Sequence, residues 1–492
     1  MRPSWKILAT VAATGLAVPQ LAIADDVEAQ LHQMQQRMSE LENKLQATND
    51  ELETSKQKAD QQQQLIEKAG LDESRGAASG LAEFLNSVEV DGFVAASYNY
   101  NFNALKDQDM AQPGVPGDFG PTTVAGENGG ILAITAPGHT NDNTFQLDQL
   151  WIGIGKTATM ESPAGFRADI VYGALADANR EGTFYTNGPP DDQSYSADDH
   201  GTGDLPHLFQ AYAEYLAPVG ENGISVKGGR FATLIGAESF RQDANWNITR
   251  GITWALQPVN HTGLLVSGKC TSCGIDWALG VVNGYSDTMS DRDNEKGFLG
   301  GLKYSRETWA YATNIFYGGD SGDWAPWAFA GFGAGTPNGA GRSGDKIGVS
   351  DHILFWNPTD KFSAWVNYDF YWTADSNDSA SGNTGFTDTK VHALALASRY
   401  AVGDATGVSL RGEYQAWDLN APGNNPELTF WALTGTVDHT LTENLIVKAE
   451  VRYDVGKQSG GPDNFFLDGG DGPTAFDDND QLLGLVQMMY KF

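Results

Sequence analysis

The sequence has 492 residues, with 58 Gly, 13 Trp, 17 Tyr and 23 Phe, and with 63 Asp or Glu against 31 Lys or Arg. A net charge of -32 argues against a protein that binds nucleic acid by neutralising its phosphates. The aromatic content argues against a disordered chain, and two Cys are too few for a disulfide-dense scaffold.

Residues 1–24 have the pattern of a secretory signal peptide. Arg2 and Lys6 precede an uncharged run that closes with Ala22-Ile23-Ala24, a cleavage site of the A-x-A type. No later window has the apolar length of a transmembrane helix. A mature protein that crosses a membrane must therefore do so as a β-barrel.

Residues 25–69 are expected to form a coiled coil, because apolar side chains recur there with heptad spacing. They are Leu31, Met38, Leu45, Leu52, Ala59 and Ile66 on one row, and Val27, Met34 and Leu41 on the other. A single helix that is this polar cannot bury its apolar seam alone. Partner helices are therefore needed, which implies a homo-oligomer. The alternative is a solvated, partly disordered spacer. Residues 70–87 form a linker.

Beyond the linker, apolar and polar residues alternate with the period of two that is typical of β-strands. The cleanest example is 445–455, where Val447 and Val451 alternate with Lys448, Glu450 and Arg452. Sixteen such segments are expected, at 88–102, 144–157, 164–176, 207–217, 223–231, 260–268, 274–283, 295–305, 308–318, 344–356, 361–373, 388–401, 408–417, 427–440, 445–455 and 481–492. Fourteen or eighteen strands remain as alternatives.

The gaps between these segments alternate between long and short, beginning with 103–143 and 158–163. Long loops at one end and short turns at the other are typical of an up-and-down barrel of the bacterial outer membrane. We therefore expect residues 88–492 to form an all-β, 16-stranded antiparallel transmembrane barrel with its charged positions facing a watery lumen. The localisation expected for the chain is the outer membrane of a Gram-negative bacterium, with the coil in the periplasm.

Three stretches resemble a known family. The last strand has apolar residues at every second place back from Phe492, which resembles the signal that the barrel-insertion machinery reads in porins. Two further stretches are similar to the OmpL-like β-barrel porin group: Gly228-Gly229-Arg230-Phe231-Ala232-Thr233-Leu234-Ile235-Gly236-Ala237-Glu238 and Pro258-Val259-Asn260-His261-Thr262-Gly263. The resemblance implies a homotrimer in outer-membrane lipid that passes small hydrophilic solutes.

The gap 232–259 is too apolar to lie in water, so we expect it to fold against the inner wall as a pore constriction. Its charged residues are Glu238, Arg241, Asp243 and Arg250. The wall residues expected to face them are Arg167, Asp169, Lys227 or Arg230, Arg399, Arg411, Glu413, Lys448, Glu450 and Arg452. Opposed charges across a constriction would orient polar solutes. The alternative is that they are ion pairs that stiffen the loop.

Cys270-Thr271-Ser272-Cys273 lies in an expected hairpin turn. Four residues bring the two Cα atoms within disulfide range, and an exported chain meets an oxidising compartment. We expect a disulfide between Cys270 and Cys273 rather than a redox or metal site.

Acidic clusters fall in expected external loops, at Asp191-Asp192, Asp198-Asp199, Asp468 to Asp471 and Asp477 to Asp480. Carboxylates on Gly-rich turns suit Ca²⁺, although none matches an EF-hand loop. A solvated acidic surface is the alternative, and no cofactor is otherwise expected.

The sequence thus favours a diffusion channel for small hydrophilic solutes and ions, and catalytic motifs are missing. One alternative is a selective channel for organic anions such as dicarboxylates, with Arg230, Arg241, Arg250, Arg399, Arg411 and Arg452 as its track. The other is a structural anchor that is tethered through its coiled coil.

Overall fold

The computed structural model of the chain describes residues 46, 84, 87–102, 143–178, 207–285, 295–319, 346–374, 388–420, 427–459 and 480–492. The chain divides into two compact units, Met1–Asn86 and Ser87–Phe492. Within the first unit the expected signal, coil and linker lie outside the described residues, apart from Gln46 and Phe84, which are both helical. The second unit contains every strand described below.

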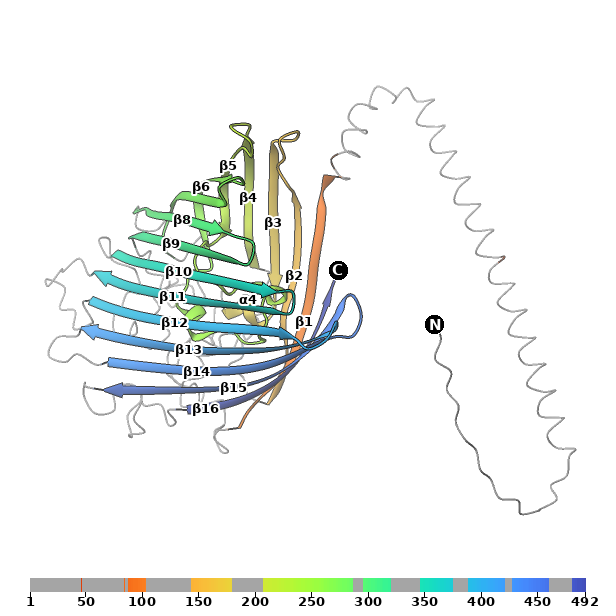
Figure 1. Cartoon of the computed structure of the whole chain (residues 1–492), viewed down its shortest axis with the longest axis vertical. Coiled ribbons are helices and arrows are strands. Elements are labelled where there is room, and N and C mark those ends of the chain that lie inside the picture. Colours follow the sequence, from red (N-terminus) through yellow and green to blue (C-terminus); the bar gives the residue numbers. More distant parts are fainter. Residues whose placement is uncertain are drawn as a thin grey trace, which may run out of the picture. The chain divides into compact units, whose positions relative to one another are not determined.

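Sixteen strands make up the second unit (Figure 1). They are β1 (Glu89–Asn101), β2 (Thr144–Lys156), β3 (Ala164–Tyr172), β4 (His207–Ala217), β5 (Ile224–Ala232), β6 (Asn260–Cys270), β7 (Ile275–Val282), β8 (Gly297–Ser305), β9 (Trp309–Gly319), β10 (Lys346–Thr359), β11 (Phe362–Ala374), β12 (Asp388–Ala401), β13 (Thr406–Asn420), β14 (Glu427–Thr440), β15 (Leu445–Ser459) and β16 (Asp480–Lys491). Short helices α4 (Ala174–Ala178), η3 (Gln242–Ala244) and α5 (Ile252–Ala255) accompany them.

The strands form one closed antiparallel barrel in which each strand pairs with its neighbours in sequence, and β1 pairs with β16. Two backbone hydrogen bonds complete this closure, from Gly92 N to Phe492 O at 3.0 Å and from Phe492 N to Gly92 O at 2.9 Å. The expected fold and its sixteen strands are confirmed. Several bounds, such as those of β4, β12 and β14, agree residue for residue with the sequence expectation.

The two ends of the barrel differ in the length of their connections. One end carries the turns 157–163, 218–223, 271–274, 306–308, 360–361, 402–405 and 441–444, and we call it the short-turn end. The other, which we call the long-loop end, carries connections such as 102–143 and 320–345. The alternation expected from the sequence is therefore present.

The outward face is apolar, as expected. Exposed side chains there include Ile152, Leu279, Leu396 and Val451, which alternate with buried inward residues. This face suits lipid, since large exposed apolar surfaces are costly in water.

The inward face departs from the expectation of a lumen lined by charges alone. On β7 to β14 the half near the long loops contains an apolar cluster that includes Val282, Phe316, Val349, Trp417 and Phe430. β10 shows this at its start, where Ile347 and Val349 are buried inward and alternate with Lys346, Gly348 and Ser350 on the other face. The polar and charged inward residues concentrate instead on β11 and β13 to β15. None of the helices among the described residues has the length and apolarity needed to span a membrane.

Candidate functional site

Residues 233–259, here called the inner loop, connect β5 to β6 and carry η3 and α5. Hydrogen bonds and ion pairs join this loop to side chains of β1, β2, β11 and β13 to β16. Because these strands lie on different sides of a closed barrel, the loop crosses its interior. Ile248, Ile252 and Leu256 on the loop are almost fully buried there.

Glu450 on β15 binds the backbone of the inner loop. Its carboxylate accepts hydrogen bonds from Ile248 N at 2.5 Å, Thr249 N at 3.0 Å and Thr249 Oγ1 at 2.6 Å. Thr436 on β14 donates to the same carboxylate at 2.7 Å and accepts from Asn247 Nδ2 at 2.7 Å. Glu450 thus fixes two consecutive loop residues directly, and Thr436 fixes the one before them.

Arg411 on β13 forms the most buried charged contact between wall and loop. Its Nη1 lies 2.6 Å from Glu238 Oε1 and donates to Thr249 O at 2.8 Å, while its Nε lies 3.0 Å from Glu413 Oε2. Gly251 N donates to Glu238 at 2.7 Å. A Cβ at position 251 would collide with the carboxylates of Glu413 and Glu238, so only glycine lets the loop backbone come this close.

A second buried arginine, Arg452 on β15, donates to Arg250 O at 2.5 Å and to Asp454 at 2.9 Å. Arg250 itself donates to Phe240 O at 2.8 Å, and its Nε and Nη1 have no hydrogen-bond partner among the described residues. Lys448 donates to Asn245 O at 2.7 Å. Loop carbonyls therefore accept from these three cationic side chains, and also from Arg411 and Lys491.

Nearer the short-turn end, Arg241 lies between two carboxylates. Its Nη1 is 2.8 Å from Asp91 on β1, and its Nε is 3.0 Å from Asp243 on the loop. Arg167 lies 2.5 Å from the other oxygen of Asp91 and 2.7 Å from Asp169. The guanidinium of Arg241 also stacks over the rings of Phe93 and Trp151, at 5.6 and 5.0 Å from their centroids.

Five expected wall residues make no described contact with the inner loop: Arg167, Asp169, Lys227, Arg230 and Arg399. Arg399 pairs with Asp438 of β14 at 2.7 Å. Arg230 donates to Phe209 O at 3.2 Å and to Asn260 Oδ1 at 3.0 Å. Gly229, which precedes it, has a φ of 135°, a conformation that only glycine adopts readily.

Burial and pairing have opposite effects on the titration of the loop residues. Burial raises the pKa of Glu238 even though the charge of Arg411 opposes this. Burial also lowers the pKa of Arg250 to about 10, which leaves it protonated at neutral pH. For Arg241 partial burial acts downward, but hydrogen bonds with Asp243 and Asp91 outweigh it and the pKa is raised.

Sequence reasoning missed a buried acid–amide network on β10 and β11. Asp351 and Asp369 are cross-strand neighbours with no exposure, and Asn367 Nδ2 donates to both at 2.7 and 2.8 Å. Gln257 Nε2 of the loop donates to Asp369 at 2.8 Å, and Ala237 N donates to Asn367 Oδ1 at 2.9 Å. Period two places both Asp residues and Asn367 inward, but it gives no sign of Gln257, which reaches Asp369 from the loop.

An aromatic cluster also went unrecognised in the sequence. Phe209 of β4 stacks on Phe240 of the loop with ring centroids 4.7 Å apart, and Trp151 of β2 lies 4.9 Å from Phe209. This contact fixes the side of the loop opposite to Arg411. The only available signal was the aromatic content of the 232–259 gap.

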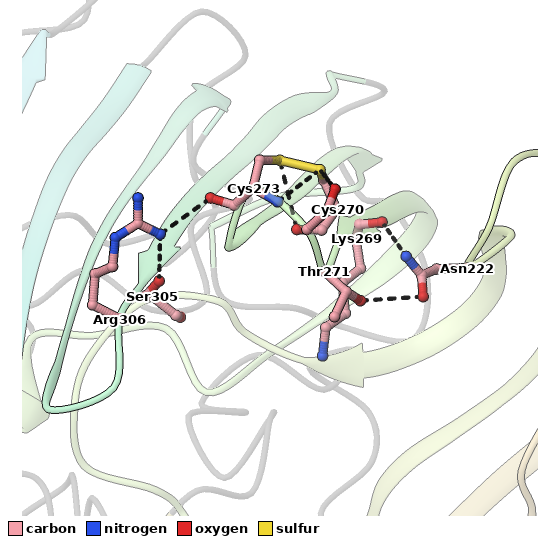
Figure 2. The surroundings of a disulfide bond; sticks show 8 residues. Asn222, Lys269, Cys270, Thr271, Cys273, Ser305 and Arg306 are labelled. Atoms are coloured by element: carbon pink, nitrogen blue, oxygen red, sulfur yellow. Dashed lines mark hydrogen bonds between the residues drawn. A yellow bond between two sulfur atoms is a disulfide. The ribbon is translucent and has the colours of Figure 1, made fainter.

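Cys270 and Cys273 are joined by a disulfide within the β6–β7 turn, with their Cα atoms 5.5 Å apart (Figure 2). Asn222 of the adjacent turn donates to Lys269 O at 3.1 Å and accepts from Thr271 Oγ1 at 3.2 Å. The disulfide closes one short turn, and the hydrogen bonds of Asn222 link that turn to its neighbour.

No group of three or more His, Cys, Asp or Glu side chains that could hold a metal ion occurs within the described ranges. The acidic loops expected to suit Ca²⁺ lie outside those ranges, apart from Asp480, which accepts from Tyr453 at 2.7 Å.

Among the solved structures that are similar to this chain are two outer-membrane proteins and a porin. A loop-deletion mutant of OmpT of Vibrio cholerae is 10% identical, with a TM-score of 0.48 over 82% of this chain and 99% of that chain. The channel DcaP of Acinetobacter baumannii is 10% identical, with a TM-score of 0.44 over 82% and 97% of the two chains. An anion-selective porin from Comamonas acidovorans is 12% identical, with a TM-score of 0.45 over 82% and 99%.

No curated protein matches the chain in sequence. The sequence profile of one family, described as "Putative beta-barrel porin-2, OmpL-like", matches residues 87–492, which is the whole of the barrel. The chain therefore belongs to this OmpL-like family of outer-membrane β-barrel porins, a family of non-enzymatic channels.

Proposed function

We propose that the chain forms a passive, water-filled channel through the outer membrane, and that the inner loop is its constriction. The observation that carries this proposal is the fixation of the loop across the lumen, from Gln149 on β2 to Asp369 on β11. A loop held on several sides narrows a 16-stranded barrel permanently, because such a barrel is otherwise wide enough for an aqueous channel.

In this proposal the charged residues of the loop serve mainly to hold it in place through ion pairs. Glu238, Arg241 and Asp243 each lie within 4 Å of an oppositely charged side chain. This supports the interpretation of the charged residues as ion pairs that stiffen the loop. Passage would then depend mainly on solute size, with small hydrophilic solutes favoured.

The alternative function, a selective channel in which unpaired arginines bind organic anions, receives less support. Arg241, Arg399, Arg411 and Arg452 each have a carboxylate partner, and the two unpartnered nitrogens of Arg250 are buried.

The proposal also includes a homotrimer whose coil and short turns face the periplasm, and a C-terminal strand that is read by the insertion machinery. The heptads of residues 25–69 support the oligomer. The pairing of Phe492 with Gly92 supports the proposed recognition of the C-terminal strand, because Phe492 takes part in closing the barrel.

Liposome swelling tests the channel and its constriction together. Vesicles that contain the refolded mature chain are placed in isotonic solutions of arabinose, glucose, sucrose and raffinose, with protein-free vesicles as the baseline. The proposal predicts swelling whose rate falls steeply with solute size. Swelling at the baseline rate would contradict a channel, and a rate independent of solute size would contradict the constriction.

A further inference from the structure

A cavity of about 470 Å³ lies between the inner loop and the inward-facing side chains of β5 to β10, in the half of the barrel near the short-turn end. Leu234 and Gly236 form its loop side. This volume lies in the range of about 300–1,000 Å³ that is typical of small-molecule sites. None of the four charged residues expected at the constriction lines it, so it is a separate part of the lumen.

Three charged side chains line this cavity, and they form a row across three strands. Lys269 on β6 is the cross-strand neighbour of Asp276 on β7, which in turn neighbours Lys303 on β8. Neither ammonium group has an ion-pair partner within 4 Å among the described residues. Two lysines against one aspartate leave a local positive charge in a strongly acidic chain.

Apolar side chains face this row of charges. Leu234 from the loop, Ile353 and Phe355 from β10 and Ala278 from β7 all line the cavity. The ammonium of Lys303 lies 5.7 Å from the ring centroid of Phe355, so positive charge and apolar surface are directly adjacent. A sugar would gain little binding free energy from contact with this apolar wall. A small inorganic anion would leave the apolar wall exposed to water.

We propose that this cavity binds small monocarboxylates that carry an apolar body, such as an aromatic or branched aliphatic carboxylate. The carboxylate contacts Lys269 or Lys303, and the apolar body packs on Leu234, Ile353 and Phe355. The inference deepens the proposed function and rests on it for the route by which the solute arrives. A site of this kind raises the local concentration of its solute beside the constriction.

The test uses three probes and single channels in a planar bilayer at neutral pH. Benzoate has both features, benzamide has the body without the charge, and acetate has the charge without the body. We expect benzoate to interrupt the current with a half-saturating concentration about tenfold below that of either other probe. Equal concentrations for all three probes would overturn the proposal.

Two matched variants locate the effect. Lys269→Gln combined with Lys303→Gln should raise the half-saturating concentration of benzoate about five- to tenfold. Lys227→Gln should leave it unchanged, since Lys227 also lies on the inner wall, over Tyr212, but does not line the cavity. An equal rise in both variants would show a general effect of lumen charge and overturn the site.

Ligand-observed NMR on the same protein in nanodiscs separates the two proposals. Benzoate binding with the expected variant pattern but without ion current would leave the site standing and refute the channel. Ion current without that binding pattern would leave the channel standing and refute the site.

Discussion

Arg411 has no solvent exposure, yet its guanidinium contacts Glu238, Glu413 and the carbonyl of Thr249. A buried ion pair contributes little net stability when complete, because desolvation offsets the attraction. Removing one partner is costly, since the remaining charges stay buried without compensation. The contact of Arg411 therefore affects the free energy of unfolding most strongly when one of its partners is removed.

We predict that Arg411→Met destabilises the barrel by about 3–5 kcal/mol, because it leaves Glu238 and Glu413 buried and unpaired. Unfolding in guanidinium chloride, followed by tryptophan fluorescence in detergent micelles, measures the change. Arg399→Met is the matched control. The side chain of Arg399 is 31% exposed and that of its partner Asp438 is 10% exposed, so this ion pair is partly open to water and its loss should cost about 0–1 kcal/mol. Equal costs for the two variants would contradict this account of the loop contact.

Because Cys270 and Cys273 form a disulfide, we predict that iodoacetamide does not label the folded, unreduced protein. After reduction, the protein should take up two labels. Mass spectrometry of the intact chain reads this directly. Replacing both cysteines with serine should cost no more than about 2 kcal/mol, because the loop that the bond closes is very short. Labelling without reduction would show that the bond is absent.

Which residues contact one another was predictable only within strands. Arg411 and Glu413, or Arg452 and Asp454, lie two residues apart on one face, so period two places them together. The contact between Arg411 and Glu238 spans 173 residues, and nothing local in the sequence specifies it. The same holds for Gln257 and Asp369, which are 112 residues apart.

At the scale of elements, the strands were the easiest feature to predict. Alternation is a local signal, and each strand needs it to face lipid on one side. β15 shows this most clearly, and it extends four residues beyond its predicted end at 455 to Ser459. The signal failed on the inner face near the long loops, where Val349 and Phe430 are apolar but buried inward.

The position of the inner loop followed from its composition, since an apolar connection had to be buried. Its contacts could not follow, because a barrel offers many inward residues and the sequence does not say which ones the loop meets. Gly251 illustrates the difficulty: its role depends on two carboxylates from a distant strand and from the loop itself.

Replacing residues 237–255 with a short Gly-Ser linker should raise single-channel conductance by about twofold or more, because an unobstructed 16-stranded barrel has an aqueous lumen. Heat-modifiable mobility on gels provides the folding control for this variant. A folded variant whose conductance is unchanged would show that the inner loop does not narrow the path.

At the scale of the whole molecule, closure of the sheet determines which wall residues can contact the inner loop. The pairing of β1 with β16 brings Asp91 and Lys491 to one side of the lumen, where Arg241 and Asp243 of the inner loop meet them. The sixteen strands thus form one closed wall around the inner loop. Passage along that lumen is the property on which the account depends.

Single-channel conductance of the refolded mature chain in a planar bilayer tests this most directly. We expect stepwise openings in groups of three, stable at low voltage, with a conductance that the loop-excised variant exceeds. A correctly folded, heat-stable barrel that carries no current would contradict the channel, and single steps that never group in threes would contradict the trimer.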